Sequence, residues 1–418
     1  MQYIVRKVLK VVLCIAFAGA CLLLVLRFGF DIDVFDRRTV LVLCLPDTDA
    51  EGVYGKLAKR YMEQNEKVKI QLEVVNGKGY EEYLYNQFSR EKAPDIFVVT
   101  QEVDMTLMAN NEYLLDMSDA YGDLFDNGFL ISRIPREPVW ELPINGSIPL
   151  IFYNKDVFLH NNFAKPENMS DFLKLCAAIQ AYDMVAVSMS VYENGDWGIE
   201  NFIENIMVNG MDWKSGALTE SGELNSGFYD LRYIRADLLD KLLPKERSVQ
   251  GHPELLAMFA NGEYAMISGT SEDILTLNQF ENGQEYGIFA LAGMGNSRRI
   301  AFRSDMSLAV SAQSSKQGAL EDFMGFLLSG EAQSFLHGET GLLPVCSGVT
   351  VGEEYKEVYR LLSSSEIMLS FMNRTSSAEY AICMERINVM FSQTAVDYDV
   401  FMQDWLEELS GVLQISTN

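Results

Sequence analysis

Histidine and clustered cysteine are scarce in this 418-residue chain. It contains 3 His and 6 Cys, and none of them stands at a spacing typical of metal ligands or of a redox-active CxxC pair. The motifs HExxH and GxSxG and a glycine-rich phosphate loop are also missing. The sequence therefore predicts no metal, no cofactor and no enzymatic activity. Its 59 Asp and Glu residues leave open a facing pair of carboxylates of the kind that glycosidases use.

Positive charge is also in short supply. The chain has 33 Lys and Arg against 59 Asp and Glu, which gives a formal net charge of -26. An acidic surface repels phosphate backbones, so we expect no nucleic acid partner. The length and the 48% hydrophobic content suit two or more globular domains. Four widely separated cysteines, whose pairing the sequence leaves open, are Cys44, Cys176, Cys346 and Cys383.

The first thirty residues carry a targeting pattern. Basic residues between positions 6 and 10 precede an uncharged apolar run from Val11 to Leu26, and acidic residues follow from Asp31 onward. Such a run is long enough to span a bilayer, and its basic flank favours a cytoplasmic N-terminus. We therefore predict that residues 1–30 form a signal or transmembrane anchor helix and that the remaining chain lies outside the cytoplasm.

Three fates of this segment stay open: an uncleaved anchor, a cleaved signal peptide, and lipidation at Cys21. Ala18-Gly19-Ala20 is similar to a small-residue cleavage site. The box that ends at Cys21 lacks the leucine expected at its first position, and cleavage there would leave Leu22–Leu26 where a polar tether is expected. The pattern favours the uncleaved anchor.

Strand and helix patterns alternate at the start of the exported part. Thr39–Leu45 is apolar and β-branched, Val68–Val74 alternates apolar with polar residues, and Asp95–Val99 has the pattern of a short buried strand. Between these strands, apolar residues recur at helical spacing up to Glu66 and again over Tyr80–Phe88. A β-α-β-α-β order predicts a mainly parallel sheet with helices on both faces.

Later patterns extend the mixed α/β character. We predict strands over Met184–Ser190 and over Tyr264–Ile267, the second of which ends at Ser268-Gly269. No fixed-period repeat divides the chain. Helical spacing is found over Phe172–Ile179, Leu255–Phe259, Leu320–Leu328 and, with aromatic residues that we expect in the core, Glu379–Leu409.

Four stretches of the chain resemble one known family. Their order and spacing over most of residues 39–350 are similar to those of the family-1 extracellular solute-binding proteins of ABC importers. These are type II periplasmic binding proteins and include maltose-binding protein. The most specific motif is Tyr153-Asn154-Lys155-Asp156. The matching stretches are Ala93–Ile96, Glu141–Ile144 with Leu150–Phe158, Met258–Met266 and Phe323–Pro344.

The resemblance implies two α/β lobes with a ligand between them. The chain would cross between the lobes near residues 145–150, 302–308 and 338–344. The N-terminal lobe would hold residues 39–146 plus 304–341, and the C-terminal lobe would hold residues 147–303 plus 342–418. Closure about these hinge crossings would trap the ligand.

The resemblance also implies a function. Members of the family capture a small solute, most commonly a sugar, and deliver it to ABC permease subunits. We therefore expect the solute-binding component of an ABC importer, anchored at the cell membrane with its binding domain extracellular or periplasmic. A carbohydrate is the favoured solute. Two alternatives stay open: a ligand-sensing ectodomain that partners a membrane signalling protein, and a structural or adhesive role.

Polar residues at strand ends are ligand contacts that the resemblance implies. Asp47 and Asp49 follow the first strand, and Gln101 and Glu102 follow the third. Carboxylates suit sugars because their oxygens accept hydrogen bonds from neighbouring hydroxyls. Each residue also suits a turn or a helix cap, so both roles stay open.

Polar residues at the first crossing belong to the same set. Asn145 and Ser147 would face the floor of the cleft, as polar groups do at this place in the family. Gly146 between them is explained by a backbone that must bend. The three residues therefore predict a tight polar crossing.

Four further contacts are implied in the second lobe and at the second crossing. Trp197, in the loop Tyr192–Trp197, suits stacking on a pyranose ring or packing within its own lobe. Ser271 stands where many members of the family carry a sugar-stacking Trp, and Glu272 follows it. This departure indicates a smaller, more polar or cationic ligand, with a solvated Glu272 as the alternative. Arg303 suits either a clamp on a carboxylate or phosphate or pairing with an acidic side chain.

Overall fold

The computed structural model describes most residues between 38 and 416. Among them, no helix combines the length and the apolar character that a membrane span requires. The predicted anchor, residues 1–30, lies outside the described residues. The described ranges are 38–46, 48–100, 103–120, 138–189, 198–210, 217–219, 221–238, 251–281, 283–291, 293, 299–346, 348–375, 377–392 and 397–416.

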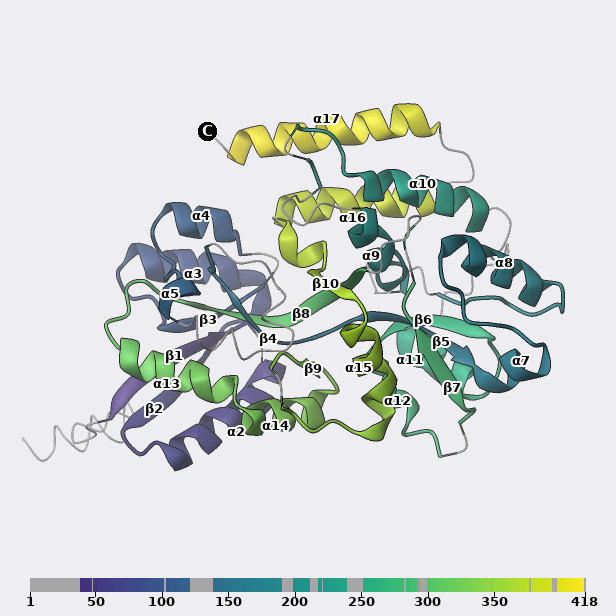
Figure 1. The fold of residues 1–418 in the computed structure, drawn as a ribbon. Coiled ribbons are helices and arrows are strands. Elements are labelled where there is room, and N and C mark those ends of the chain that lie inside the picture. The colour runs from purple at the N-terminus through teal and green to yellow at the C-terminus, as the bar shows by residue number, and fades with distance from the viewer. Residues whose placement is uncertain are drawn as a thin grey trace, which may run out of the picture.

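The first lobe is built on a seven-stranded sheet (Figure 1). Strands β1 (Thr39–Leu45), β2 (Val68–Val74) and β3 (Ile96–Val99) are parallel, with β1 in the middle. They confirm the predicted β-α-β-α-β order, because α2 (Thr48–Gln64) and α3 (Tyr80–Ser89) connect them. In Figure 1, one face is covered by α3, α4 (Met105–Asn110) and α5 (Met117–Ala120), and the other by α2, α13 (Gln317–Leu327) and α14 (Gly330–Thr340).

The second lobe is built on a three-stranded antiparallel sheet in the order β6-β5-β7. Ile151 and Phe152 of β5 point to opposite faces and belong to two separate hydrophobic cores, as the period of two in a strand requires. The strands are β5 (Pro149–Asn154), β6 (Met266–Thr270) and β7 (Tyr286–Phe289). The helices around them are α7 (Lys155–His160), α8 (Met169–Gln180), α9 (Gly198–Gly210), α11 (His252–Ala260) and α12 (Asp273–Leu277).

Three passes of the chain join the two lobes. Strand β4 (Leu142–Ser147) continues through Ile148 into β5. Strand β8 (Arg299–Val310) pairs with β10 (Glu366–Leu369) at its beginning and with β3 and β4 farther along. Strand β9 (Leu343–Pro344), which follows α14, pairs with β4. The second of these passes is one continuous strand.

The C-terminal helices pack on the second lobe. Helices α16 (Ser377–Ser392) and α17 (Tyr398–Ser416) lie beside α10 (Ser226–Leu238) at the top of Figure 1. The Trp405 ring is fully buried, with its centroid 4.7 Å from that of Phe228 and 6.0 Å from that of Phe401. The predicted core role of the C-terminal aromatic residues is thus confirmed. The remaining helix of this part, α15 (Lys356–Ser363), follows β9 and lies against β7.

Two local predictions differ from the structure. In the segment predicted as the strand Met184–Ser190, the described residues form only an isolated bridge between Ser188 and Ile267. The backbone N–H of Ser188 donates to Met266 at 2.9 Å and its carbonyl oxygen accepts from Ser268 at 3.1 Å, and among the described residues of this segment the pairing extends no farther. Strand β6 also continues through Gly269 instead of ending there. A Cβ on Gly269 would lie 2.4 Å from Asp273 Oδ2, so this glycine marks close packing within the strand.

Candidate functional site

A cluster of polar side chains lies where the three passes of the chain meet. It draws on α2 and β8, on the end of β4, on the turn after β6, and on the start of α9. The members are Tyr54, Asn145, Ser147, Asn201, Ser271, Glu272, Arg303 and Asp305, which we call the crossing cluster.

A fixed contact joins the first crossing to the turn after β6. The backbone N–H of Ser271 donates to the carbonyl oxygen of Ile148 at 3.0 Å, and the N–H of Ile148 donates to Ser271 Oγ at 3.2 Å. Ser271 is fully buried. Its small side chain therefore holds the crossing in place, which a tryptophan at this position would not do.

A double irregularity in the pairing of β4 with β8 directs Asp305 outward. Pro143 pairs with Ser307, but Gly146 pairs with Ser304, and the register shifts on both sides of Asn145. Bulges of this kind turn one side chain away from the regular face. Asp305 is exposed, although every other residue of β8 from position 300 to position 310 is buried.

Gly146 permits the close approach of these two strands. A Cβ at this position would lie 2.2 Å from the carbonyl oxygen of Arg303 and 2.4 Å from the Phe302 ring. Any side chain would therefore push β4 away from β8. The bend that the sequence suggested at Gly146 is a close backbone contact.

Arg303 connects the elements of the crossing cluster. Its Nη1 donates to Asn201 Oδ1 at 3.2 Å, and its Nη2 lies 3.5 Å from Ser147 Oγ and 3.8 Å from Glu272 Oε2. The Arg303 side chain is only 9% exposed, whereas that of Glu272 is 34% exposed. The guanidinium group therefore lies beneath the carboxylate, which is the group that solvent reaches.

Helix α9 is tied to the crossing by asparagines at every fourth residue. Asn205 Nδ2 donates to the carbonyl oxygen of Pro149 at 2.9 Å, and its Oδ1 accepts from the N–H of Ala301 at 2.9 Å. Asn209 Nδ2 donates to the carbonyl oxygen of Arg299 at 2.9 Å, and Asn209 Oδ1 accepts from the N–H of Arg299 at 3.1 Å. Residues four apart share one face of a helix, so the spacing of Asn201, Asn205 and Asn209 is a sequence signal for this contact.

The pKa values of the two carboxyl groups in the cluster are raised. Burial, together with the charge of Asp305, raises the pKa of Glu272 to about 7, although Arg303 acts in the opposite direction. Burial also raises the pKa of Asp305, partly offset by Arg303. Asp305 nevertheless reaches solvent.

Tyr54 and Asn145 lie beside this acidic pair. The two side chains approach each other at 3.5 Å between Asn145 Nδ2 and the Tyr54 hydroxyl. Burial and the charge of Asp305 raise the pKa of Tyr54 far above its ordinary value, so the phenol stays neutral. Asn145 Oδ1 is buried and has no hydrogen-bond partner among the described residues.

A histidine–aspartate pair stands next to Glu272. His252 Nε2 lies 2.8 Å from Asp273 Oδ1, and Asp273 Oδ2 accepts from the N–H of Thr270 at 2.7 Å. Burial acts to lower the pKa of His252, but the hydrogen bond and charge of Asp273 raise it on balance. The described residues contain no cluster of three His, Cys, Asp or Glu side chains placed to hold a metal ion.

The structure brings half of the predicted contact residues together. Asn145, Ser147, Ser271, Glu272 and Arg303 all belong to the crossing cluster, and their contact with a ligand stays a prediction. Tyr54, Asn201 and Asp305 were not predicted as contacts. A run of polar residues inside an apolar strand is the sequence signal for Asp305, whereas nothing in the sequence of α2 distinguishes Tyr54 from a core tyrosine.

The other predicted contacts are not placed by the structure. Asp49 lies in the first turn of α2, and its side chain is not among the described ones. The remaining four predicted residues lie outside the described ranges: Asp47, Gln101, Glu102 and Trp197.

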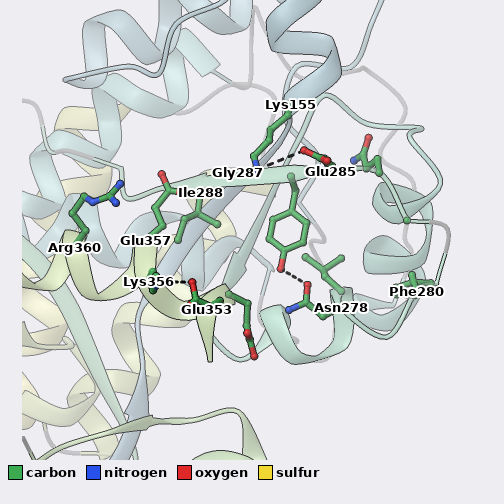
Figure 2. Close-up of a pocket in the computed structure, with 15 residues that line it drawn as sticks. Lys155, Asn278, Phe280, Glu285, Gly287, Ile288, Glu353, Lys356, Glu357 and Arg360 are labelled. Atoms are coloured by element: carbon green, nitrogen blue, oxygen red, sulfur yellow. Dashed lines mark hydrogen bonds and ion pairs between the residues drawn. The ribbon is translucent and has the colours of Figure 1, made fainter. Parts of the chain in front are cut away.

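A second candidate is a cavity of about 570 Å³ between α15 and the α12–β7 segment (Figure 2). We call it the α15 hollow; residues around it include Lys155, Asn278, Glu285, Glu353 and Lys356. Figure 2 shows its charges beside one another: Lys155 Nζ lies 3.9 Å from Glu285 Oε2, and Lys356 pairs with Glu353. These four side chains are 49–83% exposed. These four charges at the surface of the hollow therefore already have partners.

Comparison with known families identifies the chain. The family of bacterial extracellular solute-binding proteins matches residues 48–334, which is more than half of the sequence. The chain belongs to this family. This solute-binding protein is therefore a binding protein and not an enzyme, in agreement with the missing catalytic motifs.

Relatives of this solute-binding protein share its fold at low sequence identity. The multiple sugar-binding protein of Streptococcus mutans is 21% identical over 313 residues, which are 72% of this chain and 74% of that protein. The putative binding protein MsmE of Bacillus subtilis, in an open conformation, has a TM-score of 0.75 at 17% identity, covering 91% of this chain and 99% of that chain. A chitin oligosaccharide binding protein has a TM-score of 0.69 at 16% identity, covering 90% and 98%. The structural likenesses confirm the predicted two-lobed α/β fold.

Proposed function

We propose that this protein captures a saccharide at the crossing cluster and delivers it to the permease subunits of an ABC importer. The observation that carries the proposal is the convergence of polar side chains from both lobes where the three passes meet, with Glu272 and Asp305 reaching solvent there. Lobes that close about these passes enclose what lies between them. The names of the Streptococcus mutans relative and of the chitin oligosaccharide binding protein support a carbohydrate.

The residues of the cluster have two roles: some hold the crossings together, and others bind the solute. Ser147, Ser271 and Arg303 hold the crossings together, because their polar atoms are buried and bonded to protein groups. Glu272 and Asp305 offer carboxylate oxygens that accept hydrogen bonds from a solute. The five predicted contacts that the structure does not place would complete the site from the loops around it.

The proposal includes the domain limits and the location of the protein. The N-terminal lobe would comprise residues 39–146 plus 304–341, and the C-terminal lobe residues 147–303 plus 342–418. Residues 1–30 would hold the protein at the membrane with both lobes outside the cytoplasm. Transport would then depend on docking of the loaded lobes to the permease.

A thermal-shift screen of the purified full-length protein against mono- and oligosaccharides tests the proposal. A saccharide at 100 times its dissociation constant is expected to stabilise the protein by about 2.7 kcal/mol. The Asp305→Ala variant should lose most of this shift, whereas the control Glu285→Ala in the α15 hollow should keep it. No shift with any saccharide, or an equal shift in the Asp305→Ala variant, would contradict the proposal.

A further inference from the structure

The histidine–aspartate pair ties helix α11 to the turn that follows β6. His252 is the first residue of α11, and its Nε2 lies 2.8 Å from Asp273 Oδ1. The other carboxylate oxygen of Asp273 accepts from the backbone N–H of Thr270 at 2.7 Å. Gly269 gives the carboxylate room to reach the strand, because a Cβ there would lie 2.4 Å from Asp273 Oδ2. Asp273 therefore connects the histidine ring directly to the backbone at the end of β6.

The end of β6 is in turn bonded to the first crossing between the lobes. Thr270 pairs with Pro149, the first residue of β5. The next residue, Ser271, donates its backbone N–H to the carbonyl oxygen of Ile148 at 3.0 Å and accepts from the N–H of Ile148 at 3.2 Å. An unbroken series of polar contacts therefore leads from the histidine to the chain that passes between the lobes.

The carboxylate in this series depends on the histidine for its counter-charge. The Asp273 side chain is only 9% exposed, and among the described residues His252 is the only basic side chain that forms an ion pair with it. A nearly buried carboxylate without a counter-charge lowers the stability of the fold around it. The His252 side chain is 24% exposed, so the ring can exchange a proton with solvent. Its ordinary titration range lies close to neutral pH.

The charged groups around the ring favour its protonation on balance. Helix α11 packs against α12 and β6, and this strand carries no titratable side chain. Burial acts to lower the pKa of His252, whose Nδ1 has no hydrogen-bond partner among the described residues, and Arg303 of β8 acts in the same direction. The hydrogen bond and charge of Asp273 raise this pKa, as does the charge of Glu272, and the raising effects prevail. Glu254, the acidic residue in the first turn of α11, is exposed.

We propose that His252 is a pH-sensitive clamp on the first crossing. When the ring is protonated, its ion pair with Asp273 holds the turn after β6, and this turn holds Ile148 in place. When the ring loses its proton, the carboxylate loses its counter-charge and the turn opens more readily. The clamp itself goes beyond the proposed function, because its contacts are present without a solute. Its consequence, that closure of the lobes on a solute responds to pH, rests on the proposed function.

Titration of the histidine ring tests the first step. The chain has 3 His, so protein made with isotope-labelled histidine gives three sets of ring signals by NMR, and the His252→Gln variant assigns one of them. The midpoint for His252 should lie above the ordinary value of 6.5 and should fall in the Asp273→Asn variant. A wild-type midpoint at or below 6.5 would overturn the inference.

Hydrogen exchange of the solute-free full chain tests the second step. Stabilisation by a group with a raised pKa is complete below its ordinary value and is lost as the pH rises through the folded value. Protection of residues 147–150 and 269–273, corrected for intrinsic exchange, should therefore fall between pH 6 and pH 8. The expected fall is about fivefold, the difference between a hydrogen bond with and without an added charge.

Matched histidine variants assign the change in protection. His252→Gln keeps an N–H donor for Asp273 but does not titrate, so it should lose most of the pH dependence. The control His160→Gln, at the exposed end of α7, should retain it. Because Glu272 also titrates beside the crossing, the comparison is repeated in the Glu272→Gln background.

The outcomes separate the clamp from the proposed function. Equal pH dependence with His252 and with glutamine at this position, in both backgrounds, would overturn the inference. It would leave saccharide capture standing, because none of these measurements uses a solute. A melting temperature near that of the wild type shows that His252→Gln folds. If this variant does not fold, the titration of wild-type His252 decides.

Discussion

The crossing cluster and the α15 hollow both contain carboxylates, but they use them differently. In the hollow, Lys155 and Lys356 each lie beside a glutamate at the surface, where an ion pair contributes about 0–1 kcal/mol. In the cluster, the carboxylate of Glu272 lies 3.8 Å from the buried Arg303, whose charge also acts to lower the pKa of Asp305. The difference teaches that the net charge of -26 does not locate a site, because what matters is whether each carboxylate already has a partner.

The cluster and the hollow also differ in the structural elements that position their side chains. The hollow lies between α15 and the segment before β7, and both contribute surface side chains to it. The cluster lies where the passes between the lobes meet, and Ser271 of the cluster and the neighbouring Asn205 are bonded to backbone atoms of the crossings. Substitutions of the buried groups that bond the crossings should therefore lower the stability of the protein, whereas substitutions around the hollow should have small, local effects.

Glycine replacement gives the largest expected contrast between the two regions. Gly146→Ala should destabilise the protein by about 2–3 kcal/mol or more, because the new methyl group would lie 2.2 Å from a backbone oxygen of β8. The matched variant is Gly283→Ala at the hollow, where the nearest atoms lie 3.2 Å from the added Cβ. Its cost should stay below about 1 kcal/mol. Urea denaturation measures the free energy of unfolding of both variants, and equal losses of stability would contradict the contrast between the two regions.

Asparagine replacement gives an intermediate effect. Asn205→Ala should destabilise the protein by about 2 kcal/mol, because it leaves the carbonyl oxygen of Pro149 and the N–H of Ala301 buried without partners. At the hollow, Asn278 accepts a hydrogen bond from Tyr286 in an exposed setting. Asn278→Ala should therefore cost about 0.5 kcal/mol. Chemical denaturation should rank the two variants in this order, and a larger loss for Asn278→Ala would contradict the account.

The pH dependence of stability gives the smallest and most specific contrast. The pKa of Glu272 in the folded protein is about 7, above its ordinary value of 4.5, so the folded state binds a proton that the unfolded state has already released. Stability should fall as the pH rises between these two values. Glu272→Gln removes this loss and should gain about 1 kcal/mol relative to the wild type at pH 8, after allowance for solvent screening.

The control for this prediction is the exposed Glu353 at the hollow. Glu353→Gln should leave the melting temperature at pH 8 close to that of the wild type, because this side chain is 83% exposed. The advantage of Glu272→Gln should disappear below pH 4.5, where the wild-type carboxyl is protonated in both states. An advantage of the same size at pH 4.5 and at pH 8 would show that the carboxyl does not titrate as described.

The periodic parts of the fold were predictable from the sequence. Strands β1 and β2 have the predicted bounds, Thr39–Leu45 and Val68–Val74, because apolar alternation fixes both the strand and its buried face. The crossings proposed near residues 145–150, 302–308 and 338–344 came from the family resemblance and not from periodicity. The bulge at Asp305 was not predictable, because it depends on how β4 and β8 pair over a sequence separation of more than 150 residues.

The chemistry of the site was predictable only in part. The residue types at the crossing, among them Asn145 and Arg303, were identified from the family pattern. Their burial and pairing were not, because these depend on which side chains face each other after folding. Ser271 is an example: the sequence marked it as a departure from a stacking tryptophan, and the structure shows its hydroxyl accepting a bond from the crossing. The raised pKa of Glu272 depends on burial and on neighbouring charges that only the folded structure places.

Amide hydrogen exchange with and without the saccharide found by thermal shift tests the central claim most directly. If the solute binds at the crossing cluster, protection should increase in residues 145–148, 270–273 and 303–306, because closure of the lobes stabilises these passes. Residues 278–287 and 353–360 around the α15 hollow should exchange as before. Protection confined to the hollow, with no change at the three passes, would contradict the account.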